Sequence, residues 1–181
     1  MVGRYCTGET AILEALIPIV LQHRPGPLVD IGVGQSTMWL GHYGEVFDVP
    51  FLSCDIVKDQ RILYPWHYHF RCSSLEFMYV IPVDSVAVVH LDGCHDFEVV
   101  REEVMFFYQM LIPGGIIFIH DTYPPTEGHL TQGFCSDAYR VRQELEKEGF
   151  IPDLFTWPYT ASNCGLTMIT KREPNRRYFQ W

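Results

Sequence analysis

Residues 28–37 constrain the fold of this chain more than any other stretch. They read Leu-Val-Asp-Ile-Gly-Val-Gly-Gln-Ser-Thr. The apolar run Leu28–Ile31 predicts a buried strand, the glycines predict a tight turn, and a helix is expected from its cap Ser36 towards Tyr43. A strand that passes through a glycine turn into a helix is typical of a nucleotide-binding corner in an α/β sheet. The alternative interpretation of residues 28–37 is an ordinary structural turn between a strand and a helix.

The details of this loop indicate which cofactor it suits. The pattern is G-x-G-x-x-T, with Thr37 where a dinucleotide-binding loop has its third glycine. Asp30 stands beside the turn, where a carboxylate would repel a pyrophosphate. The same carboxylate suits a cofactor with an ammonium and a sulfonium group, such as S-adenosylmethionine (SAM). The loop therefore favours SAM over a nicotinamide dinucleotide.

The rest of the chain alternates between strand and helix patterns. Val86–Leu91 is a continuous apolar run, typical of a strand buried on both faces of a parallel sheet. A helix with an apolar face is expected from Phe97 to Leu111, with Arg101, Glu102 and Glu103 on its polar side. Further strands are expected at 50–56, 68–72, 115–119, 151–159 and 165–170, the last two as an antiparallel pair; further helices are expected at 9–23, kinked or interrupted by Pro18, and at 136–148, between a Ser136 cap and Gly149. Residues 1–181 are therefore expected to form one α/β sandwich domain with helices on both faces of the sheet.

Composition and charge narrow the function classes. Thirteen Lys and Arg residues against 22 Asp and Glu give a net charge of −9, which makes a nucleic-acid partner unlikely on electrostatic grounds. The basic cluster around Lys171 and Arg176 is expected to be a solvated strand end and tail. No signal peptide and no apolar run of the roughly 18 residues of a membrane span are found. The six cysteines form no C-x-x-C pair, so neither a disulfide framework nor a zinc site is expected and a cytoplasmic, reducing location is favoured.

An aspartate stands at the carboxyl end of four of the first five expected strands. In open α/β sheets, ligands bind at the carboxyl ends of the strands. Asp55 lies twenty-five positions after Asp30, close to the spacing at which an acid meets a ribose diol. A turn-starting aspartate is the alternative for Asp55. The residues at the five strand ends are Asp30, Asp55, Ser73 with Ser74, Asp92 and Asp121.

Asp92 and Asp121 form a second candidate site. If their strands are neighbours, about 4.8 Å apart, the two carboxylates face each other and either raise one pKa or hold a cation. Oxygen ligands favour Mg²⁺, Ca²⁺ or Mn²⁺, and His95 and His120 are close enough in sequence to join them. The alternative is a helix-capping and a turn-starting aspartate without a metal.

The histidines divide into different expectations. His95 follows a strand and is either a general base, with an ordinary pKa near 6.5, or a helix-entry residue bonded to backbone. His90 lies within an apolar strand and is expected to be a hydrogen-bonded core residue. His67 and His69 flank a strand without a pattern that predicts their partners.

Three stretches carry a resemblance to a known family. They are residues 29–37, residues 91–100 with the pattern D-G-x-H-x-[YF]-E-x-V, and residues 113–122 with the pattern P-G-G-x-x-x-x-H-D-T. The chain resembles the class I SAM-dependent methyltransferases, most closely the subgroup of macrocin-type O-methyltransferases and cephalosporin-hydroxylase-like proteins. The resemblance ends at Tyr123. It implies a Rossmann-like three-layer sandwich whose seven-stranded, mostly parallel sheet has an antiparallel last strand.

The resemblance also implies roles for the residues at the strand ends. Asp30, Gly32 and Gly34 would approach the methionine part of SAM, Asp55 would take the ribose, and Ser73 or Ser74 would lie near the adenine. Metal-using relatives hold a divalent ion with acids that match Asp92 and Asp121 and with an acid where this chain has His120. The candidate cofactor-binding residues are Asp30, Gly32, Gly34, Ser36, Asp55, Ser73, Ser74 and Asp92, and the candidate metal ligands are Asp92, His120 and Asp121.

The expected function is O-methylation of a small-molecule hydroxyl with SAM as the cofactor. His95 and Asp121 are the candidate catalytic residues, with or without Mg²⁺ or another divalent cation. The chain is short for the subgroup, so the loop 121–134 or a second subunit of a homo-oligomer would supply the acceptor pocket. The alternatives are a non-catalytic SAM-binding or interaction module and a nicotinamide-dependent oxidoreductase.

Overall fold

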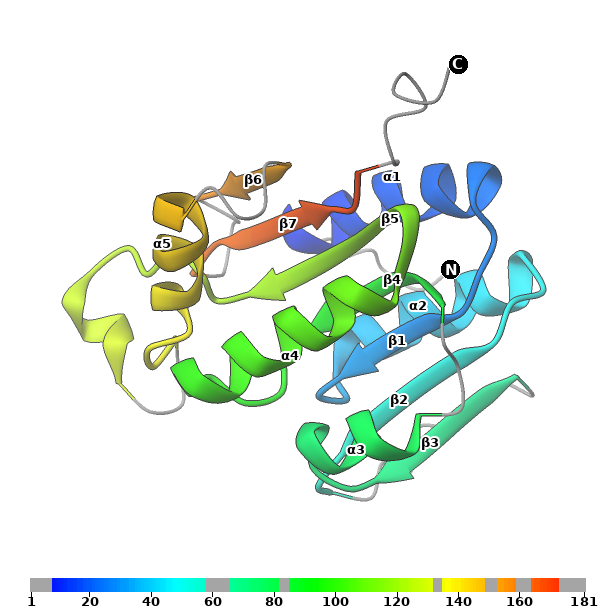
Figure 1. The fold of residues 1–181 in the computed structure, drawn as a ribbon, viewed down its shortest axis with the longest axis horizontal. Coiled ribbons are helices and arrows are strands. Elements are labelled where there is room, and N and C mark those ends of the chain that lie inside the picture. Colours follow the sequence, from blue (N-terminus) through cyan, green and yellow to red (C-terminus); the bar gives the residue numbers. More distant parts are fainter. Residues whose placement is uncertain are drawn as a thin grey trace, which may run out of the picture.

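A computed structural model describes residues 8–57, 66–81, 85–131, 135–148, 153–158 and 164–172, and its α-helices and strands are labelled in Figure 1. The helices are α1 (Gly8–His23), α2 (Gln35–Val46), α3 (Ser74–Val80), α4 (Phe97–Met110), the short 3₁₀ helix η1 (Glu127–Leu130) and α5 (Tyr139–Glu148). The strands are β1 (Leu28–Ile31), β2 (Phe51–Asp55), β3 (His67–Arg71), β4 (Val86–Leu91), β5 (Leu111–His120), β6 (Leu154–Trp157) and β7 (Leu166–Thr170). No helix of these residues is long and apolar enough to cross a membrane.

The seven strands form one sheet in the order β3-β2-β1-β4-β5-β7-β6. Strands β1 to β5 pair in parallel, and β7 pairs antiparallel with both β5 and β6. This confirms the Rossmann-like sandwich with an antiparallel last strand. The strand order reverses between β1 and β4, so their connections leave in opposite directions and open a crevice at the carboxyl ends of the strands.

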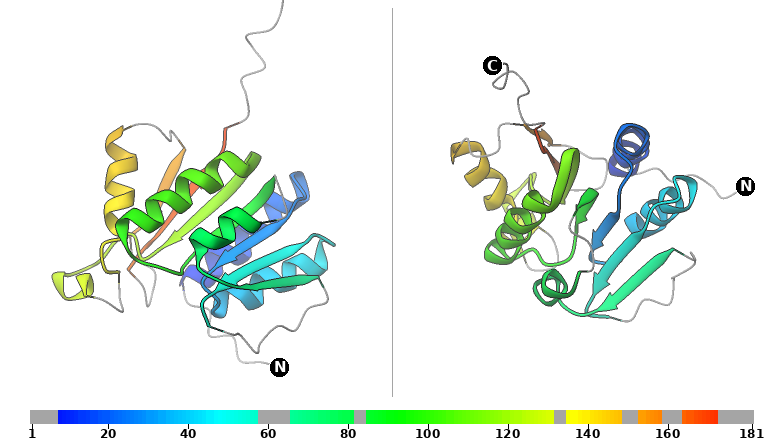
Figure 2. Two further views of the ribbon diagram at one scale, coloured as in Figure 1. Left: turned by 60° about the horizontal axis from the view of Figure 1, so that its bottom comes forward. Right: turned by 45° about the vertical axis from the view of Figure 1, so that its right-hand side comes forward.

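Helices cover both faces of the sheet. Helices α1 and α2 lie on one face, and α3, α4 and α5 lie on the other, as the two views of Figure 2 show. Each face has its own apolar core. Leu13 and Ile17 of α1 pack on Phe118 on the first face, whereas Val104 and Phe107 of α4 pack near Ile117 on the second. The alternation of the two faces along β5 follows from the strand period of two.

Several expected elements differ from the observed ones. Helix α1 continues through Pro18. Helix α2 begins at Gln35 with Gly34 as its N-cap, so the prediction that Ser36 caps it is wrong. Helix α5 begins only at Tyr139, because Ser136 has a φ of 45° and lies in a turn. Helix α3 had not been expected, although Ser73 and Glu76 form a capping box at its start. Gly149 lies outside the described residues.

Glu103 was expected on the polar side of α4, and this prediction is wrong. Its side chain is fully buried. The reason is its register, since Glu103 lies three residues after Val100 and four before Phe107, within the buried stripe of the helix. The position of Glu103 in the helical period, and not its charge, therefore decides its burial.

Candidate functional site

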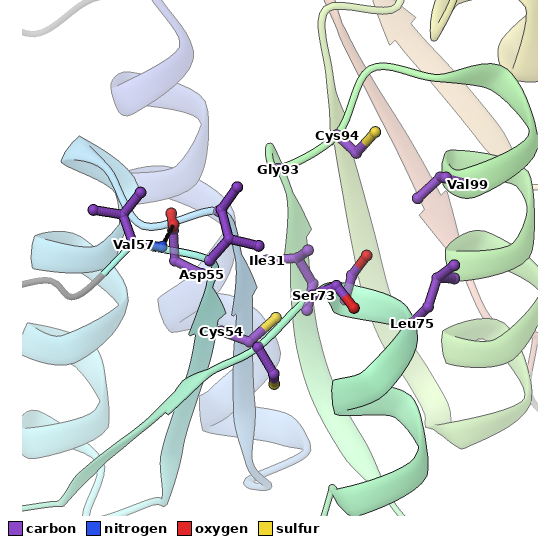
Figure 3. A pocket seen from close by; sticks show the side chains of 13 residues that line it. Ile31, Cys54, Asp55, Val57, Ser73, Leu75, Gly93, Cys94 and Val99 are labelled. Atoms are coloured by element: carbon purple, nitrogen blue, oxygen red, sulfur yellow. Dashed lines mark hydrogen bonds between the residues drawn. The ribbon is translucent and has the colours of Figure 1, made fainter.

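A cavity of about 540 Å³ opens at the carboxyl ends of β1, β2 and β4. This volume lies in the range of small-molecule and cofactor sites. Figure 3 shows Asp55 and Val57 on one wall, the Gly93–Cys94 loop above, and Leu75 and Val99 on the opposite helices. The remaining lining residues are Ile31, Gly32, Cys54, Ile56, Cys72, Ser73 and Ser74.

The glycine loop owes its shape to Gly32. This residue has a φ of 86°, and a Cβ atom would lie 2.2 Å from the carbonyl oxygen of Asp92, so no other residue type fits. The Gly32 amide donates to the carbonyl of Cys54, and the Asp92 amide donates to the carbonyl of Ile31. These bonds draw the ends of β1, β2 and β4 together around the cavity. Gly34 borders open space, where a Cβ atom would meet nothing within 4 Å.

Asp55 lies at the rim of the cavity, at the end of β2. Its two carboxylate oxygens accept hydrogen bonds from the amides of Val33 and Val57, at 2.9 and 2.7 Å. The carboxylate is thus held by backbone on both sides of the cavity mouth and still lines it. A carboxylate fixed in this way is available to a hydroxyl group of a ligand.

Ser73 and Ser74 form the wall of the cavity that belongs to α3. The Ser73 hydroxyl accepts from the Glu76 amide at 3.2 Å, and the Glu76 carboxylate accepts from the Ser73 amide at 2.9 Å. This reciprocal cap fixes the start of α3 and with it the position of both serines.

Asp30 and Ser36 do not line the cavity. Asp30 is fully buried, where its carboxylate accepts a 2.6 Å hydrogen bond from the Thr37 hydroxyl and lies 3.4 Å from the Ser36 hydroxyl. Thr37 in turn accepts from the Gly34 amide at 2.9 Å. Asp30 therefore fixes the glycine loop and the first turn of α2 from inside the protein.

His90 joins Asp30 to a residue that the sequence did not suggest. Its Nδ1 lies 2.9 Å from Asp30, and its Nε2 lies 3.2 Å from Glu9 of α1. Burial opposes the charge of His90, but the hydrogen bonds to the two carboxylates outweigh it and raise its pKa to about 10. His90 is thus the hydrogen-bonded core histidine that its place in the strand predicts. Glu9 had appeared only as a helix-start residue.

Glu9 also reaches the second candidate site. Its other oxygen lies 2.8 Å from Nε2 of His120. Burial opposes ionisation of Glu9, but its hydrogen bonds with His120 and His90 prevail and hold its pKa at about 2. No sequence signal links these residues, because Glu9 is separated from His90 by 81 positions.

Asp92, His95, His120 and Asp121 lie together where β4 and β5 end. The Nδ1 atom of His120 lies 3.0 Å from Asp92 and 3.1 Å from Asp121, and His95 lies 3.5 Å from each carboxylate. The expected pairing of the two strand-end acids with both histidines is therefore present. Hydrogen bonds to three carboxylates outweigh burial and raise the pKa of His120 well above its usual value, so this position favours a positive charge.

Donor atoms suited to a metal ion gather here in two groups. Asp92, His95 and His120 each offer one atom within 4.8 Å of the others, and Asp121 forms a second such group with the buried thiols of Cys135 and Cys164. Asp121 thus lies between His120 on one side and the two thiols on the other. Its φ of 57° is a left-handed conformation that aspartate tolerates better than most residues.

A groove lies beyond Asp121, between the loop after β5 and α5. It measures about 450 Å³, and its lining includes Tyr123, Pro124, Tyr139 and Arg142. The Arg142 guanidinium donates to the carbonyl of Thr122 at 2.9 Å and lies 4.8 Å from the centre of the Tyr123 ring. These contacts attach the described part of the loop to α5.

His67 and His69 have a shared partner that their sequence pattern did not reveal. The buried Ser53 hydroxyl of the neighbouring strand lies 2.7 Å from His67 and 2.9 Å from His69. The parallel register of β2 and β3 places Ser53 directly opposite His69. These histidines belong to the edge of the sheet and not to the candidate site.

Comparisons with known proteins show the family and the fold of this chain. A family model described as a methyltransferase domain matches residues 29–122, from β1 to just beyond β5. A comparison with curated protein sequences finds no match.

Solved structures with similar folds share little sequence with this chain. A putative O-methyltransferase from Klebsiella pneumoniae gives a TM-score of 0.67 at 13% identity, over 96% of this chain and 84% of that one. The MycE methyltransferase of the mycinamycin biosynthetic pathway, in complex with Mg and SAH, gives 0.63 at 15% identity over 91% of this chain and 50% of that one. TomG, an O-methyltransferase from Streptomyces achromogenes in complex with SAM, gives 0.58 at 11% identity, over 87% and 78%. At these identities the likeness concerns the fold.

Proposed function

The chain belongs to the SAM-dependent methyltransferase domain family, and from this premise we propose that it transfers the methyl group of SAM to an oxygen of a small molecule. The cavity at the ends of β1, β2 and β4 is the observation that carries the proposal. O-methylation is suggested by structural neighbours such as the Klebsiella pneumoniae protein and TomG. The macrocin-type subgroup, suggested by the patterns at 91–100 and 113–122, belongs to the same proposal.

The cavity suits SAM in size and chemistry. Asp55 is the ribose ligand, because its fixed carboxylate can accept from both hydroxyls of a diol. Ser73 and Ser74 lie with apolar neighbours on the wall that takes the adenine. Gly32 lines the cavity and Gly34 borders open space, and both are assigned to the methionine end of the cofactor. Asp92 follows β4 at the same edge, whereas Asp30 and Ser36 act from beneath the loop.

His95 is the proposed general base. An acceptor hydroxyl is a poor nucleophile at neutral pH, and an imidazole can take its proton as the methyl group transfers. The carboxylate of Asp121, 3.5 Å from Nδ1 of His95, orients the ring and stabilises its protonated form. The rate gain comes largely from holding the donor and acceptor in line.

Asp92, His120 and Asp121 are a donor set that fits a divalent cation. MycE was solved with Mg, and in the present chain the Asp92 and Asp121 carboxylates lie 3.0 and 3.1 Å from Nδ1 of His120. When bound, such an ion would lower the cost of deprotonating the acceptor hydroxyl. The chain's own residues position the acceptor and remove its proton through His95.

The proposal is tested by thermal melting with S-adenosylhomocysteine (SAH) and with NADH. A ligand at a hundred times its Kd adds about 2.7 kcal/mol, which shifts the Tm by roughly 5–10 °C in a domain of this size. A shift with SAH that is absent with NADH supports the cofactor. A shift with NADH alone favours an oxidoreductase, and no shift with millimolar SAH contradicts the proposal.

Turnover is tested with the tritium-labelled methyl group of SAM and a panel of phenols, catechols and sugar hydroxyls. His95→Ala is expected to reduce turnover about 10²–10⁴-fold, with the SAH shift retained. His42→Ala, an exposed histidine on α2, is the matched control. SAH binding without turnover on any acceptor would favour a non-catalytic SAM-binding module, and full activity of the His95 variant would refute the base assignment.

A further inference from the structure

Two carboxylates at the strand ends face Nδ1 of the His120 imidazole, and Nε2 of the same ring faces a third carboxylate, that of Glu9. We propose that Glu9 fixes His120 so that its Nδ1 completes a site with Asp92 and Asp121 for an imidazole-preferring ion, Fe²⁺, Co²⁺, Ni²⁺ or Zn²⁺, and not for Mg²⁺. The inference deepens the proposed function, on which it rests.

Both distances from Nδ1 of His120 to the two carboxylates fit ligands of a single ion. Two ligands bound at about 2.1 Å and at right angles lie about 3.0 Å apart. Nδ1 of His120 lies 3.0 Å from Oδ1 of Asp92 and 3.1 Å from Oδ1 of Asp121. The three atoms come from the ends of neighbouring strands β4 and β5, whose register is fixed by the sheet.

Glu9 determines which nitrogen of His120 faces these carboxylates. Its Oε2 lies 2.8 Å from Nε2, and the Glu9 side chain is only 10% exposed. A carboxylate that accepts from one ring nitrogen leaves the other nitrogen to bind a metal and increases its basicity. The Glu9 side chain is itself held by His90, which is bonded to Asp30, so the orientation is built into the core.

The donor set decides which ion is preferred. Carboxylates and water suit Mg²⁺, whereas imidazole suits Fe, Ni and Zn, and Co²⁺ follows the same order of affinities. A site of one imidazole and two carboxylates should therefore bind Co²⁺ or Zn²⁺ much more tightly than Mg²⁺. Replacing the imidazole by a carboxylate should narrow this difference.

The test measures metal binding to the full chain saturated with SAH. Co²⁺ is titrated while its visible absorption is recorded, and Zn²⁺ and Mg²⁺ are added as competitors to obtain their Kd values. The expected Co²⁺ affinity exceeds that for Mg²⁺ by more than 100-fold. In His120→Glu the ratio of the two affinities should fall at least tenfold, because Mg²⁺ gains a carboxylate ligand whereas Co²⁺ exchanges an imidazole for a carboxylate.

Glu9→Gln isolates the positioning residue. Loss of such a partner costs 10–100-fold in metal affinity, and that loss is expected here for Co²⁺. Glu14→Gln, the same change five residues further along α1, is the matched control and should leave the Kd unchanged. The SAH-induced Tm shift is measured for every variant, so a folding defect or a failure of the cofactor proposal is seen separately from a change in metal affinity.

Three outcomes would overturn the inference. The first is no Co²⁺ or Zn²⁺ binding at millimolar concentration in a protein that still responds to SAH, which would leave protonated His120 as the cation of the site. The second is an unchanged Co²⁺ to Mg²⁺ ratio in His120→Glu. The third is an intense thiolate charge-transfer band that disappears in Cys135→Ser, which would place the ion on Asp121, Cys135 and Cys164 instead.

Discussion

The two faces of the sheet each bury a glutamate, and the two glutamates differ in charge. On the face covered by α1 and α2, Glu9 lies between His90 and His120 and its pKa falls to about 2, although burial opposes this. On the face covered by α3 and α4, burial of Glu103 raises its pKa to about 7, and Ser74 is the neighbour that offsets this most. Burial acts in the same direction on both, so the partner decides the charge.

The protein thus combines an apolar cavity with a charged edge where β4 and β5 end. Charged groups are concentrated where β1, β4 and β5 meet α1, and each has an oppositely charged neighbour. On the other face Glu103, a neighbour of Ser74 in the cavity wall, carries a proton over much of the acidic range because burial raises its pKa to about 7. The same sheet thus carries paired charges on one face and a protonated acid on the other.

Removing the histidine between the two acids of the first face should have the largest effect. His90→Phe leaves Glu9 and Asp30 without the cation they share, and breaking a buried pair costs about 3–5 kcal/mol. Urea unfolding at pH 6.5 measures this loss, with His42→Phe as the exposed control. The pKa of His90 is about 10 in the folded protein, against an ordinary value of 6.5 in the unfolded chain. The charge of His90 therefore makes its full contribution to the free energy of unfolding below pH 6.5. The difference from wild type should therefore shrink as the pH rises through 10, and a pH-independent difference would contradict the ionic account.

Removing the ionisable group on the second face, that of Glu103, should stabilise the protein, whereas removing His90 should destabilise it. Glutamine resembles the protonated acid, so the Glu103→Gln variant should have the same free energy of unfolding as the wild type near pH 4.5. Above pH 7 its free energy of unfolding should be higher than that of the wild type. The sign follows from the raised pKa, since stability from the protonated form is complete below pH 4.5 and is lost as the pH rises through about 7. The difference amounts to about 3 kcal/mol at most.

Unfolding curves at pH 5 and pH 8.5 measure the Glu103 effect. Glu102→Gln, its exposed neighbour on α4, is the control. Equal stabilities of Glu103→Gln and wild type at pH 8.5 would show that Glu103 ionises inside the protein without cost.

A third carboxylate, Asp55, is neither fully buried nor paired with a histidine. Replacing it should change the affinity for SAH more than the stability of the fold. Asp55→Ala removes the proposed ribose ligand and is expected to weaken SAH binding by about 10–100-fold, the value of one or two hydrogen bonds to a charged group. Isothermal titration measures the Kd. Asp48→Ala, an exposed acid before β2, is the control, and an unchanged Kd in Asp55→Ala would remove Asp55 from the cofactor site.

The smallest expected effect concerns the serine wall beside Glu103. Ser73→Ala removes the cap of α3 and should cost about 1 kcal/mol. The measurement is the urea midpoint, compared with Ser36→Ala, in which no helix cap is lost. A loss in Ser36→Ala as large as in Ser73→Ala would show that the contact of Ser36 with Asp30 matters as much as a cap.

Much of the fold and part of the site could be predicted from local patterns. The apolar run Val86–Leu91 is a fully buried strand, and the glycine turn after Leu28–Ile31 lies at the switch point of the sheet. The spacing of acids also placed Asp92 and Asp121 beside each other. Glu103 shows the limit of such patterns, because its charge suggested a surface position that its register did not allow.

The sequence by itself determined the alternation of most strands and helices, the glycine turn and the presence of acids where the strands end, because each depends on the periodicity or conformational freedom of neighbouring residues. Only the tertiary structure decided what those acids do. It turned Asp30 inward, left Asp55 at the cavity and brought Glu9 to His90 and His120. Such partners depend on distances between elements remote in the chain, and the charge of a buried group depends on its partners.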